Sequence, residues 1–301
     1  MRFTIFQESR QGDRKGNEDR VGYSYSREVL LLTIADGMGG HLEGEVAAEI
    51  AVTEITRRFQ QEARNRLRKP HDFLVSAVNS AHHAIVSYAV EKNLLECPRT
   101  TCVTCIVQGG SAYWAHAGDS RLYVLRGGSL VAQTSDHSRV QQMIEAGAIT
   151  VEAAARHPDR NKIFSCLGGV VPPQIAISRE FPLETGDTIV LSTDGFWAQI
   201  PPVLIGNMLR KQGIVDIFPG LLTEAQRRAG GESDNLSVVA MTWEAQDDPH
   251  VADTTNLDNE QFASSSNTEQ LDMTQTNDDV TEEDIERAIA EIQSAIRKGP
   301  R

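Results

Sequence analysis

One stretch of the sequence limits the fold and the chemistry of this chain more than any other. The apolar run LLLTIA over residues 30–35 is followed by the segment DGMGG, which begins at Asp36. Half-buried strands alternate in polarity and this run does not, so we predict a strand buried on both faces. Asp36 would then lie where the strand leaves the core, and Gly37, Gly39 and Gly40 would let the backbone turn and its carbonyls approach a ligand. A hard divalent cation prefers such a carboxylate beside a bare carbonyl, but a single Asp-Gly is more often a turn.

Charge is unevenly distributed along the 301 residues. The net charge is −13, of which residues 245–301 hold about −10 and residues 1–244 about −3. Neither part has the basic patch that nucleic-acid binding needs, so we expect no nucleic-acid partner. The N-terminus lacks the apolar segment of a signal peptide, and no apolar run approaches the length of a membrane span. We therefore expect a cytoplasmic protein without membrane contact.

The four cysteines are too few for a disulfide framework in a chain of this length. Cys102 and Cys105 have the spacing of a metal-binding pair, but they lie in an alternating, strand-like run. Positions i and i+3 of a strand point to opposite faces, so we expect both thiols to pack in the core.

Polarity patterns predict strands and helices in blocks. The expected strands are 2–9, 21–26, 29–35, 100–107, 112–117, 121–125, 130–133, 175–181, 188–192 and 236–243. The expected helices are 43–66, 73–88, a short helical segment from 138 to about 155, and two helices within 201–228. The pairs Gly109-Gly110 and Gly127-Gly128 are hairpin turn signals. Because most strand connections are short, we predict an α+β fold of antiparallel sheets covered by helices rather than a doubly wound parallel sheet.

The composition changes near residue 245. We predict a catalytic domain over 1–244, an acidic disordered linker over 245–280, and a C-terminal amphipathic helix over 281–301. An isoleucine stripe in 281–298 suggests that this helix docks onto a partner or onto the protein's own surface. A marginal helix on a disordered tail is the alternative.

Three further aspartates share the setting of Asp36. Asp194 follows the apolar strand pattern of residues 189–192 and is itself followed by glycine, Asp234 lies in a glycine-rich turn before the last strand, and Asp119 lies in a tight link between strands. Carboxylate ligands without paired His or Cys favour Mg²⁺ or Mn²⁺ over Zn²⁺. The four residues together indicate a shared cation site.

The order of motifs resembles the metal-dependent protein serine/threonine phosphatases of type 2C (the PPM family), above all the compact bacterial members. The motifs are RKGNED at 14–19, DGMGG at 36–40, Thr100-Thr101, GDSR at 118–121, STDG at 192–195 and SDN at 233–235. Their spacing fits over roughly residues 3–243. The resemblance implies a four-layer α-β-β-α sandwich with two central antiparallel sheets and the metals in a cleft at one sheet edge.

The resemblance also assigns metal ligands. Asp36 would bridge two Mg²⁺ or Mn²⁺ ions, with the Gly37 carbonyl on one of them and Asp194 and Asp234 completing the other site. Asp119 with Asp194 would hold a third, weaker ion, as in bacterial relatives.

Two residues next to the ligands have implied roles as well. Asp19 matches the acid that orients metal-bound water, with Glu18 beside it, and Arg14 matches the arginine that grips the substrate phosphate. Two nearby cations lower the pKa of a bridging water, which gives a hydroxide nucleophile for in-line attack on phosphorus. Arginine offers the phosphate a fork of donors that lysine lacks.

One position departs from the animal members of the family. Where those carry a His after Asp-Gly, this chain has Met38, which cannot transfer a proton. His41 and His137 are better explained as loop or capping residues, so the general acid is unassigned. Residues 138–165 occupy the position of the variable flap beside the cleft, where substrate contact and an ordinary surface loop are both open.

The leading hypothesis is thus hydrolysis of phosphoserine and phosphothreonine in proteins, opposing a Ser/Thr kinase. The alternatives are a metallo-phosphoesterase for nucleotides or small metabolites, and a catalytically silent member that binds a phosphoprotein. The presence of Arg14, Asp36, Asp194 and Asp234 together argues against the silent member.

Overall fold

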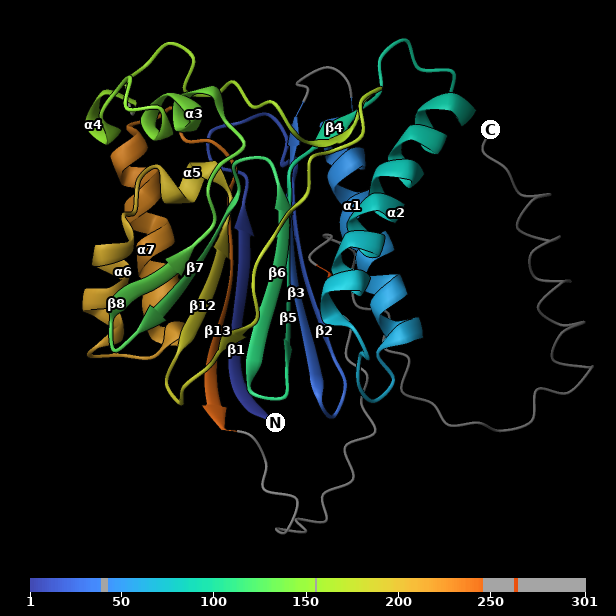
Figure 1. Ribbon diagram of the computed structural model, residues 1–301. Coiled ribbons are helices and arrows are strands. Elements are labelled where there is room, and N and C mark those ends of the chain that lie inside the picture. The colour runs from blue at the N-terminus through green and yellow to red at the C-terminus, as the bar shows by residue number, and fades with distance from the viewer. Residues whose placement is uncertain (39–42, 155, 246–262, 265–301) are drawn as a thin grey trace, which may run out of the picture. The chain divides into compact units, whose positions relative to one another are not determined.

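The computed structural model describes residues 1–38, 43–154, 156–245 and 263–264. Two antiparallel sheets face each other between helices (Figure 1), which confirms the α+β prediction. The five-stranded sheet has the order β1-β13-β12-β7-β8 and the other is built on β10-β6-β5-β3-β2-β14. The strands are β1 (Arg2–Arg10), β2 (Asp19–Tyr25), β3 (Val29–Met38), β4 (Arg99–Thr100), β5 (Cys102–Gln108), β6 (Ser111–Ala117), β7 (Arg121–Arg126), β8 (Ser129–Gln133), β9 (Leu167–Gly168), β10 (Ala176–Ile177), β11 (Phe181–Pro182), β12 (Thr188–Ser192), β13 (Leu236–Ala245) and β14 (Ala263–Ser264).

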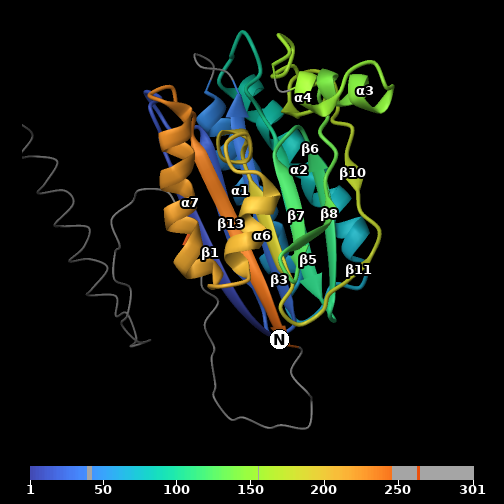
Figure 2. The ribbon, with the colours of Figure 1, turned by 90° about the vertical axis from the view of Figure 1, so that its left-hand side faces the viewer.

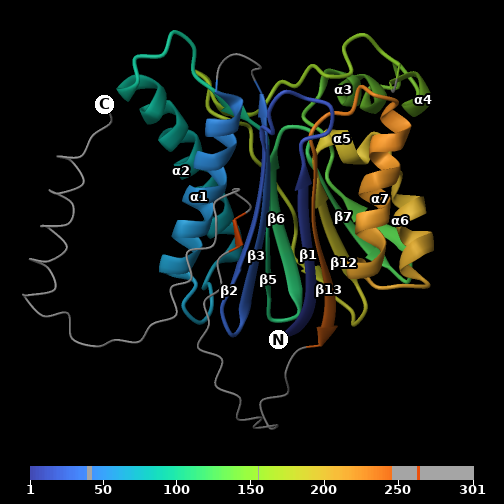
Figure 3. The same cartoon turned by 180° about the vertical axis from the view of Figure 1, so that it is seen from behind.

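Helices cover the outer face of each sheet. The helices are α1 (Gly44–Glu62), α2 (Pro70–Glu91), α3 (Arg139–Glu145), α4 (Val151–Ala154), α5 (Asp194–Trp197), α6 (Pro202–Leu209) and α7 (Ile214–Ala229). Helices α1 and α2 lie against the sheet that contains β2, β3 and β5, while α6 and α7 lie against the five-stranded sheet (Figures 1 and 3). The short α3 and α4 lie beyond one end of the strands (Figure 2). The layers are therefore α-β-β-α, as the resemblance implies.

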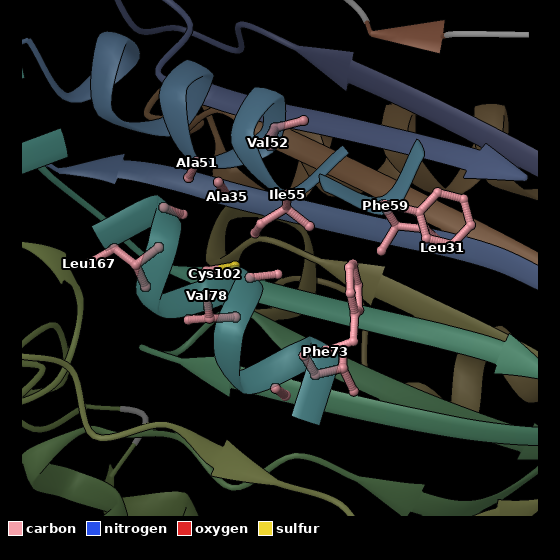
Figure 4. Packing of buried hydrophobic residues seen from close by; sticks show 14 of the residues in the cluster. Leu31, Ala35, Ala51, Val52, Ile55, Phe59, Phe73, Val78, Cys102 and Leu167 are labelled. Atoms are coloured by element: carbon pink, nitrogen blue, oxygen red, sulfur yellow. The ribbon is translucent and has the colours of Figure 1, made fainter. Parts of the chain in front are cut away.

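Three apolar cores separate the four layers. The first lies between α1, α2 and their sheet, where Ile55, Phe59 and Phe73 pack over Leu31 and Cys102 (Figure 4). The second fills the space between the two sheets, and the third lies under α5, α6 and α7. The central strand β3 contributes to two of these cores, with Leu31 on the helix side and Leu30, Leu32 and Ile34 between the sheets. This two-sided burial explains its unbroken apolar run.

The cysteines behave as core residues. Cys102 belongs to the core under α1 and α2, whereas Cys105 belongs to the core between the sheets, so the two thiols lie on opposite faces of β5 as predicted. All four cysteines are free. Burial raises the pKa of the Cys102 thiol to about 12, so the thiol stays protonated at neutral pH.

Three predicted strands need correction. The predicted strand 100–107 is divided at Thr101 into the end of β4 and the longer β5. Strand β3 continues through Asp36 and Gly37 to Met38, so Asp36 does not lie at the end of the strand. The predicted strand 175–181 is two short pieces, β10 and β11, because Ser178 interrupts the ladder: its hydroxyl, not its carbonyl, accepts the hydrogen bond of the Trp114 amide, at 2.9 Å.

Some predictions concern residues outside those described. They are the turn at Gly39 and Gly40, the role of His41, and the linker and helix beyond residue 245, for which the structure describes only the backbone pairing of Ala263–Ser264 with β2. None of the described helices is long and apolar enough to span a membrane.

Candidate metal centre

Asp36 stands next to Asp19 because the register of β2 and β3 pairs these two residues. The backbone of Asp36 is held on its other side by the β4–β5 segment. Its amide donates to the Thr101 hydroxyl at 3.0 Å, and its carbonyl accepts from the Thr101 amide at 2.8 Å and from the Thr100 hydroxyl at 2.9 Å. This hydrogen bonding explains the Thr100-Thr101 motif: the pair fixes the backbone of Asp36 and makes no hydrogen bond to its carboxyl group.

Asp194 comes from the other sheet. It is the first residue of α5, directly after β12, and Gly195 packs against the turn that precedes β13. A Cβ at Gly195 would overlap the carbonyl oxygen of Asn235 and lie 3.1 Å from the Asp234 side chain. The glycine therefore brings Asp194 and Asp234 together. The Asp194 side chain also makes a hydrogen bond with Asp36, so the two sheets meet at this pair of carboxyl groups.

Asp19 is the most deeply buried acid of the group, with 2% of its surface exposed. The Thr193 hydroxyl donates to its carboxylate at 2.8 Å, and Ser237 makes a further hydrogen bond to it. Thr193 directly precedes Asp194 in the chain, so Asp19 is tied to the element that carries that ligand candidate. This position suits a group that orients a neighbour rather than one that binds an ion alone.

Arg14 and Asp234 form an ion pair in this structure. The Arg14 guanidinium donates to Asp234 at 2.6 Å, and the two side chains are 61% and 37% exposed. This contact raises the pKa of Arg14. The loop of Arg14 is fastened by Asn235, whose side chain donates to the carbonyls of Gln11 and Gly16 at 2.7 and 2.9 Å and accepts from the Glu18 amide at 2.8 Å.

Asp119 lies in the link between β6 and β7. Its carbonyl accepts a hydrogen bond from the Trp197 indole at 3.0 Å, and the neighbouring Ser120 hydroxyl contacts the Thr101 hydroxyl at 2.7 Å. Asp119 lies close enough to Asp36 for its negative charge to raise the pKa of Asp36. The charge of Asp194 raises the pKa of Asp119 in the same way. The structure thus brings together every acid that the sequence nominated.

The acids perturb one another strongly. Burial, followed by charge repulsion, raises the pKa of Asp36 well above its ordinary value. Burial likewise raises the pKa of Asp19 and of Asp119 to about 7 and that of Asp194 to about 6. A set of carboxyl groups that resists ionisation without a counter-charge is a set that positive ions would stabilise.

The carboxylate oxygens of this cluster are of the kind that divalent cations bind. Their side chains, however, do not surround a common point as they would around a bound ion. No three His, Cys, Asp or Glu side chains within the described part of the chain converge at the spacing of metal ligands. In this structure the Asp36 and Asp194 side chains are hydrogen-bonded to each other, and the Arg14 guanidinium forms an ion pair with Asp234. A cation held by these residues would take the place of the guanidinium on Asp234, and oxygen-only donors suit Mg²⁺ or Mn²⁺.

Other nominated residues play supporting parts. Met38 pairs with Arg99 of β4. The His137 ring is stacked on His116, with 4.7 Å between centroids, and burial with that neighbour lowers its pKa to about 4. His137 also exchanges hydrogen bonds with Gly118, which supports its interpretation as a structural residue.

In the flap region, Ser138 caps α3 by accepting a hydrogen bond from the Gln141 amide, and Arg139 and Lys162 form ion pairs with Asp159.

Sequence reasoning missed the residues that hold the ligands in place. Trp197 had no assigned role, and Thr101, Thr193 and Asn235 were only parts of motifs. Only their place in the sequence could have identified them, because each lies within three residues of one of the acids or of a residue that pairs with the strand of an acid.

Comparison with known proteins agrees with this geometry. A family model described as protein phosphatase 2C matches residues 7–238. A putative protein phosphatase 2C-type from Streptococcus pyogenes is 30% identical over 237 residues, which are 78% of this chain and 94% of that protein.

Solved structures are similar as well. Serine/threonine phosphatase Stp1 from Staphylococcus aureus has a TM-score of 0.75 and 30% identity, covering 81% of this chain and 96% of that one. The catalytic domain of serine threonine protein phosphatase PstP in complex with two manganese ions has a TM-score of 0.67 and 30% identity, covering 81% and 99%. Since the family model spans most of the sequence and its relatives share the fold, this chain belongs to the protein phosphatase 2C family.

Proposed function

We propose that this protein hydrolyses phosphoserine and phosphothreonine in other proteins, with divalent metal ions held by its cluster of aspartates. The observation that carries the proposal is the convergence of Asp36 and Asp194 from two different sheets into a hydrogen-bonded pair with raised pKa values. The names of the relatives, which are serine/threonine phosphatases, support the reaction class.

Each acid has a proposed part. Asp36 would bridge two ions, the Gly37 carbonyl would contact one of them, and Asp194 and Asp234 would hold the other. Asp119 would share a third ion with Asp194. When bound, such ions activate water for in-line attack and stabilise the oxygens of the phosphate. Mn²⁺ is favoured by the relative solved with two manganese ions, and Mg²⁺ satisfies the same oxygen donors.

The protein's own residues would orient the reactants. Asp19, fixed by Thr193, would accept a hydrogen bond from a water molecule near Asp36. Arg14 would leave Asp234 once a cation neutralises that carboxylate, and its guanidinium fork would then bind two phosphate oxygens. Its 61% exposure and its loop position allow this movement.

The test is hydrolysis of a phosphopeptide with Mn²⁺, with Mg²⁺ and with EDTA. We expect activity with a metal and none with EDTA. Asp194→Asn should lower kcat/KM at least about 100-fold, because metal ions contribute several kcal/mol to such reactions. Asp216→Asn, an exposed change on α7, is the matched control. Activity that survives EDTA, or that is unchanged in Asp194→Asn, would contradict the proposal.

Free nucleotides and sugar phosphates, assayed beside the phosphopeptide, address substrate class. A kcat/KM for a small phosphate ester above that for the phosphopeptide would indicate a metabolite phosphoesterase instead.

We also propose that residues 1–244 form the catalytic domain, with 245–280 as a linker and 281–301 as a helix that docks onto a partner or onto the protein itself. The charge of about −10 beyond residue 244 and the isoleucine stripe support this division. If removal of 246–301 changed neither activity nor partner capture nor localisation, the docking role would be withdrawn.

A further inference from the structure

Trp197 connects the two acids proposed to share the third ion. Helix α5 begins with Asp194 and ends with Trp197, one turn later. The indole Nε1–H of Trp197 donates to the carbonyl oxygen of Asp119 at 3.0 Å. The short helix that carries one acid therefore holds the backbone of the other.

The Trp197 ring is itself clamped. The Arg121 guanidinium lies over the ring, 3.5 Å from its centroid. Arg121 in turn forms two parallel hydrogen bonds to Asp136, at 2.9 and 2.8 Å, and contacts the Tyr123 hydroxyl at 3.4 Å. The Asp136 side chain is only 7% exposed. A guanidinium fixed by a planar, bidentate carboxylate therefore covers one face of the indole ring and holds it by a cation–π contact.

The other side of the Asp119 turn is also held. The His137 amide donates to the Gly118 carbonyl at 2.9 Å. Gly118 has a φ of 110°, and a Cβ there would lie 2.7 Å from the Thr101 side chain. The turn that presents Asp119 is thus hydrogen-bonded to the segment before the flap and packed against Thr101, and Trp197 joins it to the element of Asp194.

This connection matters because both acids lie just beyond a paired section of one sheet. Strands β7 and β12 pair in antiparallel register, and the last pair at this end is Arg121 with Ser192. Asp119 lies two residues before Arg121 and Asp194 lies two residues after Ser192, so neither acid belongs to the ladder. The Trp197–Asp119 hydrogen bond, which has a defined donor and acceptor, continues the connection beyond the ladder.

We propose that Trp197 is a positioning residue that sets the spacing of the Asp119 and Asp194 carboxylates and thereby the affinity for the ion they share. The inference rests on the proposed metal-dependent function. The indole N–H of Trp197 would position the Asp119 backbone in addition to the packing of the ring, and Arg121 would hold the indole in place.

The test compares Trp197→Phe with wild type in titrations of the full-length protein with Mn²⁺ alone, with free Mn²⁺ followed by electron paramagnetic resonance. Phenylalanine keeps an aromatic face for Arg121 but lacks the N–H. We expect the weakest class of bound Mn²⁺ to lose about 3- to 10-fold in affinity, the effect of one hydrogen bond, with the tighter classes unchanged within about twofold. Arg121→Lys, which loses the fork, should weaken the same class.

Two controls make the result decisive. Trp243→Phe is the same substitution at a buried tryptophan in the core between the sheets, and it should leave Mn²⁺ binding unchanged. Asp119→Asn should remove the weakest class. Thermal melts of all variants without metal separate a folding defect from a binding defect.

Equal Mn²⁺ binding by Trp197→Phe and wild type would overturn the inference, as would an equal loss in every class or a weakest class that persists in Asp119→Asn. The proposed function has its own test in Asp194→Asn on a phosphopeptide. If that variant is inactive while Trp197→Phe binds Mn²⁺ normally, the positioning role fails and the phosphatase proposal stands.

Discussion

The glycines that follow Asp36 and Asp194 are needed for close packing. From the sequence alone, Gly37 is explained by a turn and by access of its carbonyl to a ligand. In the structure Gly37 continues strand β3, and a Cβ there would overlap the Gly44 carbonyl at the start of α1. Gly195 meets the Asn235 carbonyl in the same way. Both glycines let a second backbone segment approach the acid beside them, so each contributes to the site through contact between segments.

This packing predicts a large effect for Gly195→Ala. The added methyl must push the 233–235 turn away from α5, which should destabilise the protein by about 1–3 kcal/mol and weaken Mn²⁺ binding at Asp194 and Asp234. The matched control is Gly220→Ala on α7, where a Cβ meets no atom within 4 Å. That change should stabilise the helix by about 0.5–1 kcal/mol. Urea unfolding and Mn²⁺ titration check both, and equal stability of the two variants would refute the packing argument.

The stacked pair of His137 and His116 predicts a pH dependence of stability. Burial and the neighbouring ring lower the pKa of His137 to about 4 in the folded protein, while the unfolded chain titrates near 6.5. Between these values the unfolded state binds a proton that the folded state does not, so this residue's contribution to stability falls as pH drops from 6.5 towards 4.

The measurement is the free energy of unfolding at pH 7 and pH 5 for wild type and His137→Gln. The variant should lose less stability on acidification, by about 1 kcal/mol after allowance for the partial exposure of the ring to water. Taking the difference between the two proteins cancels the titration of the acidic cluster. An identical loss in both would show that His137 does not stay neutral in the fold.

At the scale of helices and strands, the features that depend on local sequence, such as tight hairpins and long strands, could be predicted. The hairpins at Gly109-Gly110 and Gly127-Gly128 follow from glycines with positive φ at both positions, and the long strands follow from their polarity patterns. The elements that were missed, α5, β4, β9 and β14, have two to four residues each. Pieces of that length have no periodicity to detect, and tertiary contacts define them: β4, for example, exists through its pairing with β3 and β9.

The contacts within the site could be predicted from the sequence only where local motifs determine them. The acids were identified because each lies in a recognisable motif, but nothing in the sequence indicated that Arg14 would pair with Asp234, 220 residues away. That contact depends on the Asn235 clamp, which holds the Arg14 loop beside the 233–235 turn. Hydrogen bonds between distant loops leave no periodic pattern in either segment.

The clamp predicts that Asn235→Ala will release the loop of residues 11–18. Three hydrogen bonds to its backbone are lost, and each is worth about 0.5–1.5 kcal/mol. Transient opening of the loop should become at least about tenfold more frequent, and trypsin should cut after Arg14 or Lys15 correspondingly faster. The KM for a phosphopeptide should rise because Arg14 is no longer held near the site.

Asn207→Ala on α6 is the control and should leave both measurements unchanged, because the Asn207 side chain accepts a hydrogen bond from Arg210, three residues away on the surface. Trypsin cleavage at the wild-type rate in Asn235→Ala would show that the loop is held by other contacts.

At the scale of the whole molecule, β13 is the last long strand among the residues that the structure describes. This strand lies between β1 and β12, and its residues enter two cores: Val239 and Met241 pack between the sheets, while Val238 and Ala240 pack under the helices. Among the described residues, none of the three apolar cores has a buried member beyond Trp243. Strand β13 also follows directly on Asp234 and Asn235, so it positions a ligand candidate as well as joining β1 to the rest of the five-stranded sheet.

A chain that stops at Glu244 should therefore fold and act as a phosphatase on its own. It loses the acidic segment and the short pairing of β14 with β2, so its melting temperature should stay within about 4 °C of the full-length value, equivalent to about 1 kcal/mol. Its kcat/KM on a short phosphopeptide should be unchanged. A chain that stops at Asn235 lacks β13 and should not fold, because two cores are opened and β1 loses its partner. Circular dichroism melts and phosphopeptide assays of the two truncations decide the boundary: if the longer one melts far below full length or loses activity, residues beyond 244 belong to the catalytic domain.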